Sequence, residues 1–357
     1  MNNKDFTQLG AEGSENYQAA NNITINKIGL SFAEAKDLIM LVMEQNFIKF
    51  SEQALATARI RAEEMTTDYL NGLAARNPAL VEAVQQPGIQ MAIVAAQKEY
   101  IKTGDKFLAE LLVNTLIERT NQPQRTVLQI ALDESLSIIG KLTNNQINMI
   151  VLSFAVLSVT VVGINSLESF KSMCDSDIKP LVEILRIGGS DLAHIVGCNC
   201  GLLLPKKQDY LVDWQRRYKG LFSKGFTQKE IEDILEMTFT SVNTQCPGLF
   251  VNCLHDKDKI QIGYMDEDVF EKNIVEFSIS QETKIRIKTL FLGNVMSTGE
   301  MQIYLSTFGD YMEKLFAMMH QGTLALLVLN AVGQTIAVTA YGKILNKSLD
   351  YKLWIPD

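Results

Sequence analysis

The stretch "INMIVLSFAVLSVTVVGI", Ile147 to Ile164, decides how the fold of this chain is interpreted. It carries no charged side chain and lies within a longer uncharged run, residues 142–167. Eighteen helical residues reach about 27 Å, close to the hydrocarbon thickness of a bilayer. The stretch therefore predicts either a membrane-contacting helix or a helix buried in a protein core. Its β-branched end, "VTVVGI", also leaves a buried strand open.

A second run without formal charge extends from Leu315 to Gly342, counting His320 as neutral. One prediction is a membrane-associated helix in which Asn330 and Gln334 face a bundle interior. The other is a strand over 324–329 and a helix from Asn330, closing a winged-helix-like unit. The residues expected to contact a membrane in the two runs are Ile150, Phe154, Leu157, Val161, Leu326 and Val328.

Composition limits the class of protein. The chain has 357 residues, 47% of them hydrophobic, and a formal net charge of −8, which is typical of a globular protein. An acidic total argues against broad nonspecific binding of nucleic acid but permits a local basic patch. The five cysteines show no regular spacing, which suits a reducing compartment. The polar N-terminal stretch lacks the parts of a secretory signal, so we expect a cytoplasmic start.

The pattern along the chain predicts a mainly α protein in four parts. Residues 1–28 are expected to form a flexible arm with a short strand over 22–28. Residues 29–141 predict a helical oligomerisation domain. Residues 142–205 are expected to be an apolar helical segment and a candidate for membrane contact. Residues 206–357 predict a mixed α/β region that includes the second uncharged run, 315–342.

The helical domain carries the clearest local signals. Ser31 and Glu34 fit a capping box, and the apolar pattern that follows predicts one long helix ending before Pro78. Shorter helices are expected over 90–103, 105–119 and 124–141. In the C-terminal region, Thr227 and Glu230 form another capping box, and residues 249–264 predict a β-hairpin.

No motif indicates an enzyme. Cys198 and Cys200 lack the pairing of a zinc site, and Cys246, Cys253 and His255 do not supply it either. The histidines have no nucleophile elbow beside them, and no phosphate-binding loop with its lysine is present. We therefore expect no catalytic residue, no metal and no cofactor.

A local basic patch is the one positive signal for binding. Trp214 and Tyr218 lie in a stripe of aromatic residues spaced four apart, which places them on one helix face. The expected phosphate-binding set is Lys206, Lys207, Arg216, Arg217, Lys219, Trp214 and Tyr218. Three interpretations stay open: a solvated helix face over an aromatic core, contact with anionic lipid, or binding of single-stranded nucleic acid by base stacking.

Several blocks together resemble a known family. These blocks are residues 22–64, "GDKFLAELLVNTLIERTNQPQRTVLQIALDESL" (104–136), "LNAVGQTIAVTAY" (329–341) and "LDYKLWI" (349–355). They resemble a bacterial family similar to HalA, the membrane effector of the Hailong anti-phage defence system. The blocks look structural rather than catalytic, and no functional residue can be carried over from them.

The resemblance implies a non-enzymatic homo-oligomer at the cell inner membrane, with pore-like or channel-like action and cytoplasmic domains. It also implies that a single-stranded DNA oligomer, made by a partner nucleotidyltransferase, holds the protein inactive until infection removes the DNA. The alternative expectation is a soluble cytoplasmic regulator that binds nucleic acid through a winged-helix-like C-terminal part. In that case both uncharged runs belong to the core.

Overall fold

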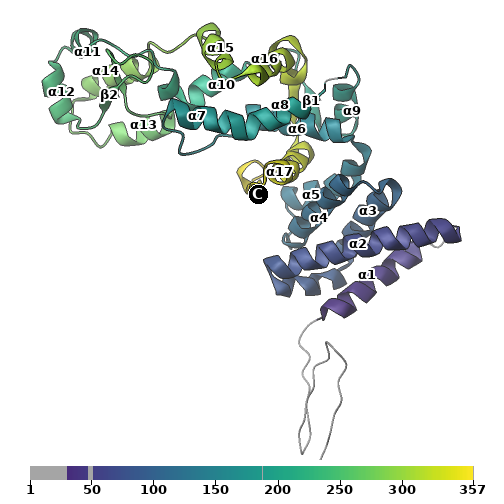
Figure 1. The fold of residues 1–357 in the computed structure, drawn as a ribbon. Helices are drawn as coiled ribbons and strands as arrows, with labels where there is room; N and C mark the ends of the chain where they lie inside the picture. Colours follow the sequence, from purple (N-terminus) through teal and green to yellow (C-terminus); the bar gives the residue numbers. More distant parts are fainter. Residues whose placement is uncertain (1–29, 47–50, 187, 357) are drawn as a thin grey trace, which may run out of the picture.

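The computed structural model describes residues 30–46, 51–186 and 188–356, and Figure 1 shows their arrangement. The described chain is mainly helical, as predicted, with two small antiparallel sheets. A helical body built from the N-terminal residues lies at one end, a smaller unit at the other, and a central body between them (Figure 1). The predicted arm, residues 1–28, lies outside the described residues.

The N-terminal body contains α1 to α5. Ser31 and Glu34 form the predicted capping box, with the Glu34 carboxylate accepting from the Ser31 backbone N–H at 2.9 Å. The expected single long helix is instead two helices, and α2 begins after Ser51, whose backbone is extended. The bounds are α1 Phe32–Asn46, α2 Glu52–Arg76, α3 Pro87–Thr103, α4 Lys106–Thr120 and α5 Val127–Ile138, with a 3-10 segment, Pro78–Gln85, between α2 and α3.

The central body is assembled from two distant parts of the chain. β1 pairs antiparallel with β4, with Gly201 opposite Leu329. The first part contains α6 Asn144–Leu157, α7 Leu167–Met173, a π-helical turn Cys174–Ile178, α8 Lys179–Ile184, α9 Asp191–Gly197, β1 Gly201–Leu203 and α10 Tyr210–Arg217. The second contains α15 Thr298–Ser306, α16 Asp310–Phe316, a π-helical turn Ala317–Gln321, β4 Leu327–Leu329 and α17 Ala331–Leu345.

Close packing between α17 and β1 depends on glycine. A Cβ atom at Gly333 would lie 1.9 Å from the carbonyl oxygen of Cys200, and one at Gly201 would lie 2.2 Å from that of Val328. No side chain fits at such distances, so Gly333 lets the start of α17 approach the residue before β1, and Gly201 lets β1 approach β4.

Helix α6 contains the first part of the uncharged stretch Ile147 to Ile164 and is mostly buried. It has fourteen residues, so it reaches about 21 Å, well short of the roughly 30 Å of a bilayer core. Only Asn144, Asn145, Asn148 and Leu157 in it are not buried. Across the described residues, no helix has both the length and the apolar character needed to cross a membrane. In this conformation the apolar side chains of α6 face the protein core, and contact of this segment with a membrane stays a prediction.

The second uncharged run also breaks into short elements. It passes through the end of α16, the π-helical turn, β4 and α17, so the strand followed by a helix is confirmed. β4 pairs with β1, however, and not with the hairpin that starts at Phe250. The winged-helix-like unit expected at this place is therefore absent from the described part of the run.

The distal unit, residues 224–296, is an insertion in the central body. The chain enters and leaves it side by side, because Ser223 forms an antiparallel bridge with Val295. The unit has a hydrophobic core of its own, around Val242, Phe270 and Ile287. Its elements are α11 Gln228–Leu235, α12 Phe239–Gln245, β2 Phe250–Asn252, β3 Ile260–Ile262, α13 Glu267–Ile274 and α14 Gln281–Leu292.

The distal unit contains a helix-turn-helix followed by a hairpin. Three residues join α11 to α12, and Glu236 among them has the left-handed φ of 52° that this kind of turn requires. The predicted hairpin is confirmed, since β2 and β3 pair antiparallel. Phe226 also bridges to Ile260 of β3 on the other side. A strand position, two helices and a hairpin thus follow one another in the order of a winged-helix unit.

Candidate functional site

Two of the residues predicted to bind nucleic acid or lipid lie inside the core. Trp214 and Tyr218 on and beside α10 are 2% and 3% exposed. Trp214 donates its indole N–H to the carbonyl of Val156 at 3.0 Å, and the Tyr218 hydroxyl accepts from the backbone N–H of Val161 at 2.8 Å. Both rings pack edge to face on Phe170. They are not available for base stacking or for a headgroup layer in this conformation.

Arg217 is half-buried and closes the C-terminal end of α6. Its guanidinium donates to the carbonyls of Val156, Leu157 and Val159 at 3.1, 2.9 and 2.6 Å. The last carbonyls of a helix have no partner within it, so another group must satisfy them when they are buried. Burial lowers the pKa of Arg217. This cation stabilises a helix end and is not free to bind a phosphate.

The other predicted cations are dispersed. Arg216 is exposed and pairs with Asp213 at 3.3 Å, while Lys219 pairs with Glu267 of α13 at 3.4 Å. Lys207 donates to the carbonyl of His320 at 2.5 Å, and Lys206 is exposed in the segment before α10. The predicted set therefore does not form one basic surface with exposed rings, and the interpretation of a helix face over an aromatic core is the one that this conformation matches.

The residues predicted to contact a membrane do not all share one surface, although Leu157 and Val328 line the same small cavity. Ile150 and Phe154 are fully buried in α6. The remaining four, Leu157, Val161, Leu326 and Val328, are partly buried and come from the end of α6, the following loop and the region of β4.

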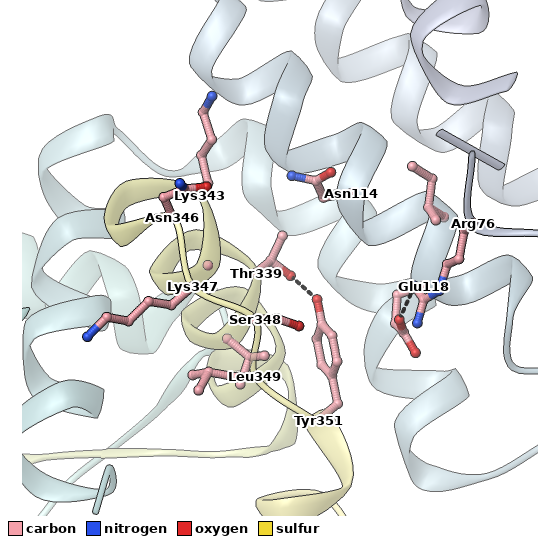
Figure 2. Close-up of a pocket in the computed structure, with 13 residues that line it drawn as sticks. Arg76, Asn114, Glu118, Thr339, Lys343, Asn346, Lys347, Ser348, Leu349 and Tyr351 are labelled. Carbon is pink, nitrogen blue, oxygen red and sulfur yellow. Dashed lines mark hydrogen bonds and ion pairs between the residues drawn. The ribbon is translucent and has the colours of Figure 1, made fainter. Parts of the chain in front are cut away.

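A polar cleft with a charged lining lies between the N-terminal body and α17. Its volume is about 700 Å³, large enough for a small organic ligand or a short stretch of oligomer. Figure 2 shows it between α4 and the chain that leaves α17. The lining residues are Arg76, Asn114, Ile117, Glu118, Val338, Thr339, Gly342, Lys343, Asn346, Lys347, Ser348, Leu349 and Tyr351.

The charge of the lining is mainly positive. Arg76, Lys343 and Lys347 contribute three cations, and Glu118 is the one carboxylate that faces the cleft. Arg76 donates to Glu118 at 2.6 Å. Lys343 pairs with Glu110 of α4, which is not part of the lining. In Figure 2, Lys343 and Lys347 leave the end of α17 in different directions. Each of these three cations is already paired with a carboxylate, so an anion entering the cleft would compete with Glu118 for Arg76 and with Glu110 for Lys343.

A left-handed residue shapes this end of the cleft. Asn346 has a φ of 52° and ends α17, which sends the chain back along the helix. The backbone N–H of Lys347 then donates to the carbonyl of Gly342 at 3.1 Å. The Tyr351 hydroxyl meets that of Thr339 at 2.8 Å across the cleft wall (Figure 2).

Lys347 connects the cleft to a buried carboxylate in the central body. Asp177 is 2% exposed and lies in the π-helical turn Cys174–Ile178. It accepts from the Tyr341 hydroxyl at 2.6 Å, from Ser176 and from the ammonium group of Lys347. Burial raises the pKa of Asp177, but the hydrogen bonds from Lys347, Ser176 and Tyr341 outweigh it and hold that pKa below its usual value. Hydrogen bonding to Asp177 and burial raise the pKa of Tyr341.

Sequence reasoning missed the polar cleft. Its cations come from residue 76 and from residues 343 and 347, which no motif or spacing connects. Lys343 directly follows the second uncharged run, and that position does not indicate a binding role. The described residues include no group of three or more His, Cys, Asp or Glu side chains placed to hold a metal ion.

Comparison with known proteins yields one match. A protein-family model whose description reads ":-like" matches residues 29–355, nearly all of the chain. No curated protein and no solved structure matches it.

Proposed function

The chain belongs to this ":-like" family, and we propose that it is a non-enzymatic homo-oligomeric effector of anti-phage defence whose state is set by an anionic ligand in the polar cleft. The proposed ligand is a single-stranded DNA oligomer made by a partner nucleotidyltransferase, as the resemblance to HalA implies. Loss of that oligomer would release the protein to act at the inner membrane.

The polar cleft is the observation that carries this proposal. Three cations against one carboxylate line it, in a chain with a net charge of −8. Arginine and lysine side chains bind phosphate groups through charge-assisted hydrogen bonds, and Asn114 and Asn346 can serve a sugar or a base edge. Tyr351 offers a ring at the cleft wall, although its hydroxyl is already paired with Thr339.

The position of the cleft suits regulation. Arg76 belongs to the N-terminal body, whereas Lys343 and Lys347 belong to the end of α17 in the central body. A ligand that binds both sides favours the arrangement in which they are close, by its difference in affinity between the two arrangements. An oligomer in the cleft would therefore hold the two bodies as they are in this structure.

Membrane action through α6 would require a large rearrangement. Four apolar side chains of α6 are fully buried, those of Ile150, Val151, Leu152 and Phe154. Exposing one such side chain to water costs about 1.5–3 kcal/mol. In the proposed scheme the ligand-bound form keeps α6 inside the core, and any contact of α6 with lipid belongs to the released form.

The cleft is tested by measuring fluorescence polarisation of a labelled 10-mer oligodeoxyadenylate over a salt series. The combined variant Arg76→Gln/Lys343→Gln is expected to weaken binding at least about tenfold, because each lost charge-assisted contact is worth more than about 1 kcal/mol. The slope of log K against log salt should fall by about 0.7 for each cation removed. The matched control, Lys272→Gln/Lys314→Gln, changes two exposed lysines elsewhere and should bind as the wild type does. Absence of wild-type binding at low salt, or unchanged binding by the cleft variant, would refute the proposal.

The homo-oligomer is tested through exposed apolar side chains of the N-terminal body. Ile60 of α2 lies in the domain predicted to mediate oligomerisation and is 68% exposed, so its side chain is available to a second subunit. Ile60→Glu should lower the mass measured by light scattering after gel filtration. Ile303→Glu, at a residue of α15 that is 74% exposed, is the control and should leave the mass unchanged. A wild-type monomer at all concentrations would argue against assembly.

The distal unit favours a second candidate function, a regulator that binds nucleic acid. In helix-turn-helix proteins the second helix reads base edges, and α12 exposes Thr240, Asn243, Thr244 and Gln245, which are all hydrogen-bonding side chains. Residues 226–262 hold six acidic side chains against three lysines, so attraction to phosphates is weak and binding should depend on sequence.

This second candidate is tested with duplex DNA. Selection from a random-sequence duplex library at low salt should enrich a defined motif, and Asn243→Ala/Thr244→Ala should abolish the enrichment. Asn273→Ala/Thr289→Ala changes exposed residues of the same types on α13 and α14 and should preserve it. If the wild type enriches no motif, the second candidate function is refuted. The function proposed for the polar cleft is not affected by that result.

A further inference from the structure

One cysteine differs from the others in its surroundings. Cys174, Cys200, Cys246 and Cys253 are buried, and burial raises the pKa of Cys200 to about 12. Cys198 is partly exposed at the end of α9. Its Sγ lies 3.7 Å from Nε2 of His194, one helical turn earlier. A thiol with an imidazole at hydrogen-bond distance has the first two members of a nucleophilic arrangement.

Gln146 supplies the third member and determines which imidazole nitrogen carries the proton. The side-chain oxygen Oε1 of Gln146 accepts the backbone N–H of Thr143 at 3.0 Å, in the capping box of α6. Nε2 of Gln146 donates to Oδ1 of Asp191 at 3.0 Å. Both contacts identify Oε1 as the acceptor oxygen and Nε2 as the donor nitrogen of the Gln146 amide. Oε1 is therefore an acceptor where it faces Nδ1 of His194, also at 3.0 Å.

The tautomer of His194 follows from this network. Because Oε1 of Gln146 only accepts, Nδ1 of His194 must donate to it. In the neutral imidazole Nε2 then has no proton and can accept one from the Cys198 thiol.

We infer that Cys198, His194 and Gln146 form a nucleophilic thiol site that reacts with small-molecule disulfides of the glutathione class. Sγ of Cys198 attacks one sulfur of the disulfide and passes its proton to Nε2 of His194. The S–S bond of the small molecule breaks, its second sulfur leaves as a thiolate, and that thiolate takes up the proton. The product is a mixed disulfide on Cys198 and one free small thiol, so electrons balance without a further oxidant.

A mixed disulfide on Cys198 would affect the packing of the central body. Cys198 precedes Asn199, which has a left-handed φ of 59° and whose carbonyl accepts from the side chain of Asn330 at 2.8 Å. The thiol of Cys200 donates to the carbonyl of Cys198. Asn330 caps α17, so the modified residue lies two contacts from the helix that forms one wall of the polar cleft. The thiol site does not depend on the function proposed for that cleft.

The rate of glutathionylation tests the inference. Full-length protein is mixed with glutathione disulfide, and intact and peptide mass spectrometry follows the added mass. We expect Cys198 to be modified first, and Cys198→Ser to remove this phase. His194→Gln, at an exposed position, should slow it at least about tenfold at pH 7, since a positioned base contributes about 10²-fold or more to proton transfer.

Two controls make the result decisive. Cys246→Ser changes a buried thiol in the core of the distal unit and should leave the rate unchanged. Circular dichroism establishes that His194→Gln remains folded, and iodoacetamide, whose alkylation of Cys198 uses the same proton acceptor, should show the same loss of rate in that variant. Equal rates for wild type and His194→Gln with both reagents, or first modification at another cysteine, would overturn the inference.

Discussion

The contact between α6 and α10 and the polar cleft both bring cations from one element against another, but they use them differently. At the first, Arg217 donates to three backbone carbonyls that end a buried helix. At the second, Arg76, Lys343 and Lys347 are among the residues that line a cavity of about 700 Å³, and each is paired with a carboxylate. A cation whose donors satisfy buried carbonyls contributes to folding, whereas a cation at the rim of a cavity can exchange its carboxylate partner for a ligand. The number of lysines and arginines in a stretch does not distinguish these roles.

The largest effect is expected from Phe154→Ala. Phe154 is fully buried in α6 and packs edge to face with Tyr341 and Trp354. Removing the ring should lower the free energy of unfolding by about 4 kcal/mol, measured by denaturation with urea. Val162→Ala, at a residue that is 89% exposed, should change it little. A small loss in the Phe154 variant would mean that α6 does not lie in the core in solution.

Arg217→Met tests the structural role of the α10 cation. The substitution leaves the carbonyls of Leu157 and Val159 without the Arg217 donor, which should cost about 3 kcal/mol, while the carbonyl of Val156 keeps the indole N–H of Trp214. Arg216→Met is the matched control, because the side chain of Arg216 is 70% exposed and its ion pair should contribute less than about 1 kcal/mol. Urea denaturation at pH 7 measures the free energy of unfolding of both variants. Similar losses for Arg217→Met and Arg216→Met would contradict the distinction between cations that satisfy buried carbonyls and cations in exposed ion pairs.

Asp177→Asn addresses the connection between the cleft and the central body. Because hydrogen bonds hold the pKa of Asp177 below its usual value despite burial, the folded form keeps the carboxylate charged where an unfolded Asp, with a pKa of about 3.9, begins to protonate. The stability this contributes is present above about pH 4 and is lost as the pH falls through the lowered pKa.

We therefore expect Asp177→Asn to lose about 2 kcal/mol at pH 7 and to show a flatter decline in stability below pH 4 than the wild type. Thermal unfolding between about pH 2 and pH 7 measures both quantities. Asp68→Asn, at an exposed position on α2, is the control and should follow the wild-type curve. If the stability of Asp177→Asn and that of the wild type fell in parallel below about pH 4, the lowered pKa of Asp177 would be contradicted.

The smallest effect on stability is expected from Lys343→Gln. The ion pair with Glu110 is largely exposed, with 38% and 49% of the two side chains accessible, so its loss should cost less than about 1 kcal/mol. Lys179→Gln removes an equally exposed pair, that with Glu183, and should cost a similar amount. Only Lys343→Gln should weaken binding of the oligomer, and a large loss of stability there would place Lys343 with the structural cations.

Local signals in the sequence predicted much of the secondary structure. The capping boxes at Ser31 and Thr227 start helices where expected, and the hairpin over 249–264 is present as β2 and β3. The helices of residues 87–138 also follow the predicted pattern closely. These features depend on residues within a few positions of one another, so the order of amino acids is sufficient to predict them.

The candidate sites depend on residues far apart in the chain. The polar cleft combines residue 76 with residues 343 and 347, and the thiol site combines Gln146 with His194 and Cys198. An uncharged run gave the same signal whether it packs in a core or faces lipid, because both environments exclude water. A stripe of aromatic residues was equally ambiguous, since Trp214 and Tyr218 need an apolar neighbour and the pattern does not say which one.

The sequence by itself determined the helical character of the chain, its helix starts and its hairpin, because capping, turn and periodicity signals act over short distances. The tertiary structure alone decided that α6 is covered by α10 and α17, that Arg217 ends α6, and that three distant cations share one cleft. These contacts depend on packing, because a buried polar group needs a donor or an acceptor from whichever part of the chain lies beside it. The spacing of residues in the sequence does not show which part that is.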